Sequence, residues 1–468
     1  MKYFMFFFIG YFLLITDIQA QTLDEAKKLY AEGKYSDASP FFENACKSSP
    51  QNASYNLWYG TCLLETGKMT KAVDYLKFAA SKNIPEAYSS LGKLYYLSYK
   101  FEESVESYRQ CTQLLIKNKQ QSEANLLKPL IERSERAARM LTKCEDVRII
   151  DSIVIDKKNF LNTYFISREA GYLDSKGESM VYENPLKNKR CFAKKDKTGK
   201  FRIFSEIKLQ DKWGEEKELS IPADSLGDDN YPFVLQDGIT IYYASTGNGS
   251  IGGYDLFITR HNSSNDTYLA PAQLGMPFNS IYNDYMMVID ENNSIGYFAT
   301  DRFQTEGKVI IYTFIPNEEM KYINLDNNEQ LISRAKIASI RDTWEKGTDY
   351  KAYISEYKKI VGEELNRKKK DFFFAVNDNT VYYTLDDFVN VAAKQAFLKA
   401  QELEKQIKTQ EKDLEDLRIA YSKGDEKYRK SISSAILYRE NHLPELREQY
   451  RKALINVRSL EIKHVKKI

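Results

Sequence analysis

The chain has 468 residues, with 68 basic and 66 acidic side chains and a formal net charge of +2. This length allows about two to four domains. The near-balance of charge argues against nucleic acid as a partner, because a nucleic-acid-binding face needs a basic excess. The chain contains 34 Tyr but only 3 Trp, and tyrosine suits half-buried strands because its ring is apolar and its hydroxyl is polar.

Residues 1–20 have the pattern of a secretory signal peptide. Lys2 forms a minimal basic region, Tyr3–Ile15 is an apolar run, and an acceptable cleavage site ends at Ala20. The apolar run is short for a membrane span, so an uncleaved anchor is the weaker alternative. We therefore expect an exported chain whose mature part has no transmembrane segment.

Five cysteines occur, and an odd number excludes complete pairing within one chain. They are Cys46, Cys62, Cys111, Cys144 and Cys191. No CxxC motif is present, which argues against a zinc or redox site. We expect buried thiols in helices, and a Cys46–Cys62 disulfide is the alternative in an oxidising compartment.

Residues 21–145 contain an internal repeat of 34 and then 32 residues. The equivalent positions are Ala26, Gly33, Ala38, Phe42 and Ala45, then Gly60, Gly67, Ala72, Leu76 and Ala79, then Gly92, Tyr99, Ser104, Tyr108 and Cys111. Small and large residues at helical spacing predict pairs of packed antiparallel helices, because the small positions allow close approach. A further helix at about 122–143 is expected to cap the stack.

This pattern resembles the tetratricopeptide repeat, with a turn glycine between two helices and small and large residues alternating in the second helix. The resemblance implies an α-solenoid whose concave face binds a peptide or a helix. The partner-binding positions that it implies are Leu57, Thr61, Leu64, Ser89, Lys93 and Tyr96. A purely structural spacer is the alternative.

Residues 146–326 change to strand-like alternation with repeats of about 50 residues. Phe192-Ala193 recurs as Tyr243-Ala244 after 51 residues and as Phe298-Ala299 after 55 more. Glycine and asparagine pairs supply the turns, since both tolerate positive φ. The literal GxGxxG at 247–252 precedes a predicted strand, so it indicates a turn and not a phosphate site.

These strands resemble the TolB-like branch of the WD-type propeller repeats. The resemblance implies a β-propeller with three clear blades and room for a fourth. The structural motif residues that it implies are Asp237, Gly238, Gly252, Gly253 and Asp255. Tyr-rich loops around Tyr242 and Tyr254 are the candidate carbohydrate contacts.

Residues 327–388 are predicted to be a connector made of a helix and a β-hairpin. Residues 389–468 show heptad spacing on two helices, with a break at 422–425. Asn441 is the expected N-cap of the second heptad run, with Pro444 in its first turn. An antiparallel hairpin within one chain and an intermolecular coiled coil both fit, so self-association through this tail stays open.

Catalytic groups are sparse. Only three histidines occur and no GxSxG motif is present, so we expect no enzyme activity, no catalytic residue, no metal and no cofactor. We expect a multidomain α + β fold, with an N-terminal α-solenoid, a central β-propeller and a C-terminal helical hairpin or coiled coil. The predicted segments are a signal peptide at 1–20 followed by 21–145, 146–326, 327–388 and 389–468.

This order of modules resembles a group of Gram-negative envelope proteins, without their terminal OmpA-like domain. The resemblance implies a scaffold or adaptor in the periplasm, with outer-membrane association as an option. Its expected partners are envelope proteins or peptides, and nucleic acid is not among them. The alternative function is a carbohydrate-binding or glycan-processing propeller protein.

Overall fold

The computed structural model describes residues 22–176, 179–209, 212–222, 227–325, 327–344, 347–368, 372, 374–377, 380–382 and 384–465. The predicted signal peptide at 1–20 lies outside these residues. The chain divides into two compact units between Ile354 and Ser355, inside helix α10 (Lys351–Lys368). The predicted domain boundaries, which differ from this division, stay predictions.

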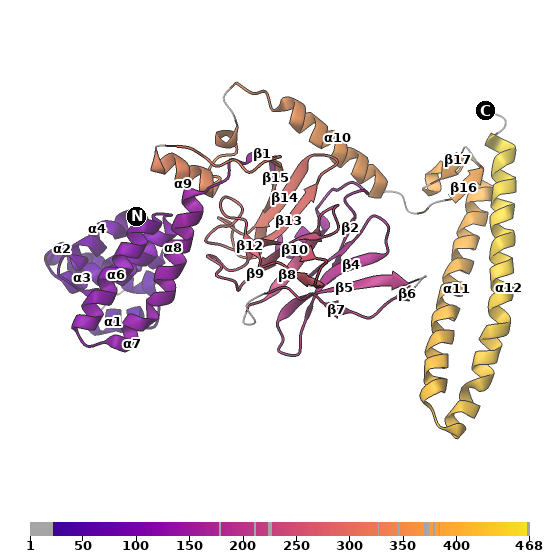
Figure 1. Cartoon of the computed structure of the whole chain (residues 1–468), viewed down its shortest axis with the longest axis horizontal. Coiled ribbons are helices and arrows are strands. Elements are labelled where there is room, and N and C mark those ends of the chain that lie inside the picture. The colour runs from indigo at the N-terminus through magenta and orange to yellow at the C-terminus, as the bar shows by residue number, and fades with distance from the viewer. Residues whose placement is uncertain are drawn as a thin grey trace, which may run out of the picture. The chain divides into compact units, whose positions relative to one another are not determined.

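The first unit begins with eight helices that stack as antiparallel hairpins (Figure 1). They are α1 (Leu23–Ala31), α2 (Tyr35–Ser48), α3 (Ala53–Glu65), α4 (Met69–Ala80), α5 (Pro85–Leu97), α6 (Phe101–Lys117), α7 (Gln121–Leu126) and α8 (Lys128–Thr142). Side chains cap two of them: Thr22 forms a capping box with Glu25 at α1, and Asn52 accepts from two backbone N–H groups at α3. Such caps satisfy donors that the first helical turn leaves without partners.

Repeated small residues set the spacing of the helix pairs. A Cβ added to Gly60 would lie 2.8 Å from the Leu76 side chain, and one added to Gly92 would lie 2.6 Å from Tyr108. Ala26 and Phe42, at the equivalent positions of the first repeat, are both fully buried in one core. Each pair joins positions 16 residues apart on successive helices, so the repeat in the sequence is a repeated helix contact.

Fifteen strands follow among the described residues of the first unit. They are β1 (Arg148–Asp156), β2 (Tyr172–Lys176), β3 (Ser179–Glu183), β4 (Lys189–Lys195), β5 (Phe201–Leu209), β6 (Lys212–Trp213), β7 (Lys217–Glu218), β8 (Asp229–Val234), β9 (Thr240–Ser245), β10 (Asp255–Asn262), β11 (Thr267–Tyr268), β12 (Ala272–Gln273), β13 (Asp284–Asp290), β14 (Ile295–Thr300) and β15 (Lys308–Ile315). They form three antiparallel sheets, with orders β2-β3-β4-β5-β6, β11-β10-β9-β8 and β1-β15-β14-β13. Strand β7 pairs with β5, and β12 pairs with β10.

The 50-residue repeat appears in each sheet as the same cross-strand aromatic pair. Phe192 opposes Phe204, with ring centroids 6.2 Å apart. Tyr243 opposes Phe257 at 5.8 Å, and Phe298 opposes Tyr312 at 5.2 Å. Directly opposed aromatic residues stabilise neighbouring strands, which explains why this position repeats.

The predicted fold class is nevertheless wrong. Within the described residues, the strands form separate small sheets that do not close into a propeller or barrel, and the architecture is mixed α + β with helices at both ends. A closed propeller typically needs four to eight blades, and only three of these meanders occur among the described strands. The loop that contains Ile251 packs on the helices instead of on a further sheet.

The segment after β15 is helical again. Helix α9 (Asn328–Lys336) and the short 3-10 helix η2 (Arg341–Thr343) precede α10. The Trp344 side chain donates to the carbonyl oxygen of Ile149 over 2.8 Å, and the Thr343 hydroxyl accepts from the backbone N–H of Ile149 over 3.0 Å. These two hydrogen bonds connect the segment to β1. The predicted helical stretch is therefore split.

The second unit is a helical hairpin that carries a small β-hairpin. It contains β16 (Phe374–Asn377), β17 (Thr380–Tyr382), η3 (Leu385–Asp387), α11 (Val391–Lys423) and α12 (Glu426–Val465). Helices α11 and α12 lie side by side (Figure 1) and bury a seam between them. The seam contains Ile407, Leu414, Leu443 and Leu446.

The expected helix start at Asn441 is wrong. Helix α12 continues through this position, and Pro444 lies inside it. Leu443 and Leu446 are 5 % exposed against α11, and this burial outweighs the backbone hydrogen bond that proline cannot make. Within the described ranges, each helix is too short or too polar to span a bilayer.

Candidate functional site

Residues from all three sheets of the first unit line one cavity of about 600 Å³. The lining consists of Asp156, Lys157, Lys158, Phe160, Leu161, Phe201, Asn230, Tyr231, Tyr254 and Gly307. They come from the end of β1 and the 3-10 helix η1 (Lys157–Asn162), from the starts of β5 and β8, and from the residues just before β10 and β15. A cavity of this size matches sites for small molecules or side chains.

Aromatic rings form the floor of this cavity. The Tyr231 ring makes edge contacts with Phe160, Tyr254 and Tyr285, at centroid separations of 5.7, 5.8 and 5.9 Å. Phe160 and Tyr231 are buried, whereas Tyr254 is half-buried. Tyr231 has φ of +54° where the pairing of β8 with β9 shifts register between Asn230 and Phe233, so this irregularity in the strand sets the direction of its side chain.

Polar groups surround the rings. Lys157 donates to the hydroxyl of Tyr285 over 2.7 Å, and this hydroxyl donates to Asp301 over 2.7 Å. Burial raises the pKa of the Tyr254 and Tyr285 hydroxyls far above the ordinary value, so both stay protonated at neutral pH. Asp156 pairs with Lys308 at 2.8 Å, and this hydrogen bond lowers the pKa of the Asp156 carboxyl.

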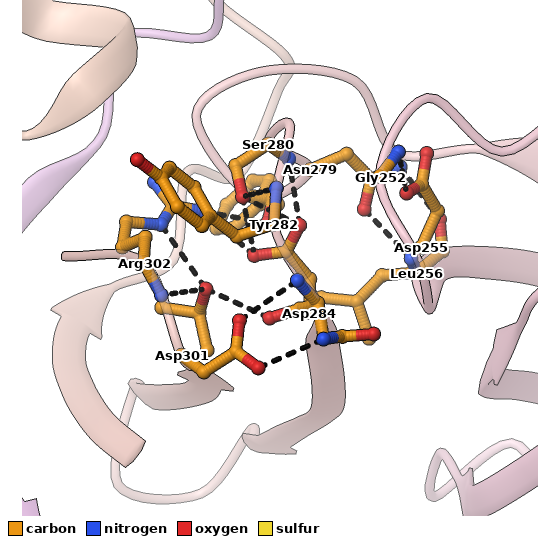
Figure 2. Close-up of polar contacts among 12 residues, drawn as sticks. Gly252, Asp255, Leu256, Asn279, Ser280, Tyr282, Asp284, Asp301 and Arg302 are labelled. Atoms are coloured by element: carbon orange, nitrogen blue, oxygen red, sulfur yellow. Dashed lines mark hydrogen bonds and ion pairs between the residues drawn. The ribbon is translucent and has the colours of Figure 1, made fainter. Parts of the chain in front are cut away.

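A hydrogen-bond network connects the cavity residue Tyr254 to the neighbouring strands. The side-chain oxygen of Asn283 accepts from the backbone N–H of Tyr254 over 3.0 Å, and its amide donates to Asp301 over 2.8 Å. Asp301 therefore holds both the Tyr254 loop and the Tyr285 hydroxyl. Figure 2 shows Asp301 beside Asp284 and Arg302 in this network.

The Gly252-Gly253 pair allows two loops to nest. A Cβ on Gly252 would lie 1.8 Å from the carbonyl oxygen of Tyr282, and one on Gly253 would lie 2.0 Å from the side-chain oxygen of Asn283. Neither position tolerates a side chain. These glycines therefore place Tyr254 at the cavity through close backbone packing.

Two buried aspartates organise the same loops (Figure 2). Asp255 accepts from the backbone N–H groups of Ile251 and Gly252 over 3.0 and 3.1 Å. Asp284 pairs with Arg302 at 2.8 Å, and both side chains are 0 % exposed. Burial, and then the charge of Asp284, raises the pKa of Asp255 well above its ordinary value. Burial also raises the pKa of the Asp284 carboxyl, and the neighbouring charge of Arg302 opposes this rise.

The remaining predicted motif residues lie in a hairpin turn. One carboxylate oxygen of Asp237 accepts from the N–H groups of Ile239 and Thr240, and Gly238 has φ of +70°. They connect β8 to β9. The structure therefore explains all five motif residues by loop geometry, and only the Gly252–Asp255 segment borders the cavity.

The six predicted concave-face residues do not form one open surface. Leu57, Thr61, Leu64 and Tyr96 are buried, Ser89 is half-buried and Lys93 is exposed. Lys93 pairs with Glu65 at 2.6 Å. The hydroxyl of Tyr96 donates to the carbonyl of Ile251, so a loop of the β part covers this end of the helix face.

Sequence reasoning singled out Tyr254 but missed its neighbours in the cavity. Phe160, Phe201 and Tyr231 lie in segments that are far apart in the chain, and no repeat relates the first two. Tyr231 and Tyr285 each follow an Asp-rich or Asn-rich turn at the start of a repeated strand. That shared placement was the available signal.

Among the described residues, no group of three or more His, Cys, Asp or Glu side chains is arranged to hold a metal ion. The combination of aromatic faces with a polar rim suits recognition of a ligand that itself has an apolar face and polar edges. No protein-family model matches this chain, and comparison with curated proteins finds no match.

Proposed function

We propose that this protein is a non-enzymatic scaffold of the cell envelope that binds protein partners. The observation that carries the proposal is a buried core shared by the N-terminal helices and the β part. Tyr96, Tyr99 and Phe101, from α5, α6 and the turn between them, pack with Ile251 and Met276 from the β loops. The two parts are thereby joined as one body.

A scaffold must hold separate surfaces in a constant relation, and a continuous apolar core supplies that rigidity. Polar contacts add to the junction. Arg334 on α9 pairs with Asp146, which follows α8, and Lys336 lies 3.5 Å from the carbonyl oxygen of Ser98 on the helical side. The envelope location is part of the proposal and is supported by the signal-peptide pattern of residues 1–20.

Cross-linking in native cells, followed by purification of the full chain from the envelope fraction, tests this function. The expected result is a reproducible set of envelope proteins, each of which rebinds the purified chain in a reciprocal assay. Recovery of the chain in the cytoplasm alone, or hydrolysis of peptide or polysaccharide libraries at enzyme-like rates, would overturn the proposal.

A second candidate function is carbohydrate binding in the aromatic cavity. Sugar rings have apolar faces and polar rims, which match the rings of Tyr254 and Phe160 and the side chains of Asn230 and Lys157. We expect binding on a glycan array that Tyr254→Ala abolishes. Tyr242→Phe is the matched control, because Tyr242 lies on β9 and is not part of the cavity lining. Equal loss in both variants would exclude this cavity as the binding site.

A further inference from the structure

A second cavity lies where helix α8 meets the loops of the β part. Its volume is about 450 Å³. Arg136 and Arg139 of α8 and Lys143, which follows the helix, line one side, and Gln273, Met320 and Tyr322 line the β side. Both parts belong to the first compact unit, so this junction pocket is built by a single body.

The lining of the junction pocket carries positive charge without a counter-charge. No acidic residue is among the lining residues, and no described acidic side chain forms an ion pair with its three cations. Three of the acidic residues nearby in sequence are engaged elsewhere: Glu135 pairs with Arg109, Asp146 pairs with Arg334, and Glu145 accepts from Asn317 over 3.0 Å. The positive potential of the junction pocket therefore favours binding of an anion.

Cations near the end of a helix often serve only to compensate its dipole. Arg136 goes beyond that role, because it lies more than a turn before the end of α8 and is held against the β part. A Cβ on Gly249 would lie 3.2 Å from its Nε atom. This Nε atom is buried and has no hydrogen-bond acceptor among the described residues. Buried donors are normally satisfied, so Arg136 is a cation at this junction whose hydrogen-bonding capacity the described residues leave partly unused.

Apolar groups stand beside these charges. Met320 is 61 % exposed and Tyr322 is 51 % exposed, and the Tyr322 hydroxyl lies 2.9 Å from the Met320 sulfur. Met140 and Leu274 complete the apolar part of the lining. A ligand that fills the pocket should therefore combine negative charge with an adjacent apolar side chain.

We propose that the junction pocket binds an acidic peptide segment of a partner protein, with side-chain carboxylates on Arg136 and Arg139 and an apolar side chain against Met320 and Tyr322. Arginine suits this task because its planar guanidinium matches a carboxylate. The inference rests on the proposed scaffold function and names the chemistry of one partner.

The test is titration calorimetry on the full chain with the peptide acetyl-Leu-Glu-Glu-amide. Its neutral counterpart, acetyl-Leu-Gln-Gln-amide, has nearly the same shape. We expect the acidic peptide to bind and the neutral one not to bind, and we expect binding to weaken at high salt. Arg136→Gln and Arg139→Gln should each weaken binding about tenfold, the loss expected for one charged hydrogen bond.

Lys128→Gln is the matched control, because this exposed lysine lies at the other end of α8. Its affinity should equal that of the unaltered chain, and circular dichroism should show that all three variants are folded. The inference is overturned if the acidic peptide does not bind, if the neutral peptide binds equally, or if the arginine variants bind as Lys128→Gln does. Displacement of the peptide by equimolar inorganic phosphate would likewise reject a peptide site in favour of a phosphate site. Each of these outcomes would reject the peptide site but leave unchanged any envelope partners that cross-linking identifies. Failure of the peptide-site inference and failure of the scaffold function are therefore distinguishable.

Discussion

Burial decides the chemistry of the five cysteines at the scale of single residues. All five are free and buried, and burial raises the pKa of Cys62, Cys144 and Cys191 to about 12. Because the thiolate is the reactive form, we expect a thiol reagent at about pH 8 to label the native protein slowly. All five thiols should react once denaturant unfolds the chain. The labelling rate is measured by absorbance, and rapid labelling of the native protein would contradict the burial of these side chains.

Asp255 should make stability depend on pH. Its folded-state pKa is raised by burial and by Asp284, so its contribution to stability is fully present below the ordinary pKa and is lost as pH rises through the raised value. We expect the free energy of unfolding of the unaltered protein to fall relative to that of Asp255→Asn as pH rises from about 4 to about 7. Urea unfolding at several pH values measures this difference, and a difference that stays constant would show that Asp255 does not titrate in this range.

Helix pairs in the N-terminal stack depend on glycine at the contact, which is a property of whole elements. We expect Gly60→Ala to lower the free energy of unfolding by about 1–3 kcal/mol, because its Cβ would overlap Leu76. Leu76→Ala opens space at the same contact, so the double variant should lose less than the sum of the two single losses. Additive losses in denaturant unfolding would show that the two side chains do not compete for this space.

The first unit should respond as one body, which is a property of the whole molecule. Ile251 is fully buried between the helices and the β part, so Ile251→Ala should cost about 2–5 kcal/mol. We expect faster hydrogen exchange in α5 and α6 as well as in β9 and β10. Exchange that rises only in the strands would mean that the helices are stable without the β part. Exposed Leu269→Ala, on a loop after β11, is the control and should leave both regions unchanged.

Local order was predictable to a large extent, because short-range spacing carries it. The repeat that joins Gly60 to Leu76 predicts a close helix contact, and the repeat at Phe192, Tyr243 and Phe298 predicts equivalent strands. Both contacts occur. The prediction of a closed propeller was wrong because a strand pattern in the sequence does not show how many sheets pack together. It also does not show which other elements cover the ends of those sheets.

The sequence by itself determined which faces of the helices and strands are apolar and where the glycine turns lie, since these depend on neighbours within a few residues. Only the tertiary structure decided which partner each face meets. Strand β1 pairs with β15 more than 150 residues later, Ile251 meets Tyr96 on a helix, and three separate segments bring Phe160, Phe201 and Tyr254 to one cavity. Apolar burial is not directional, so periodicity alone could not select these long-range partners.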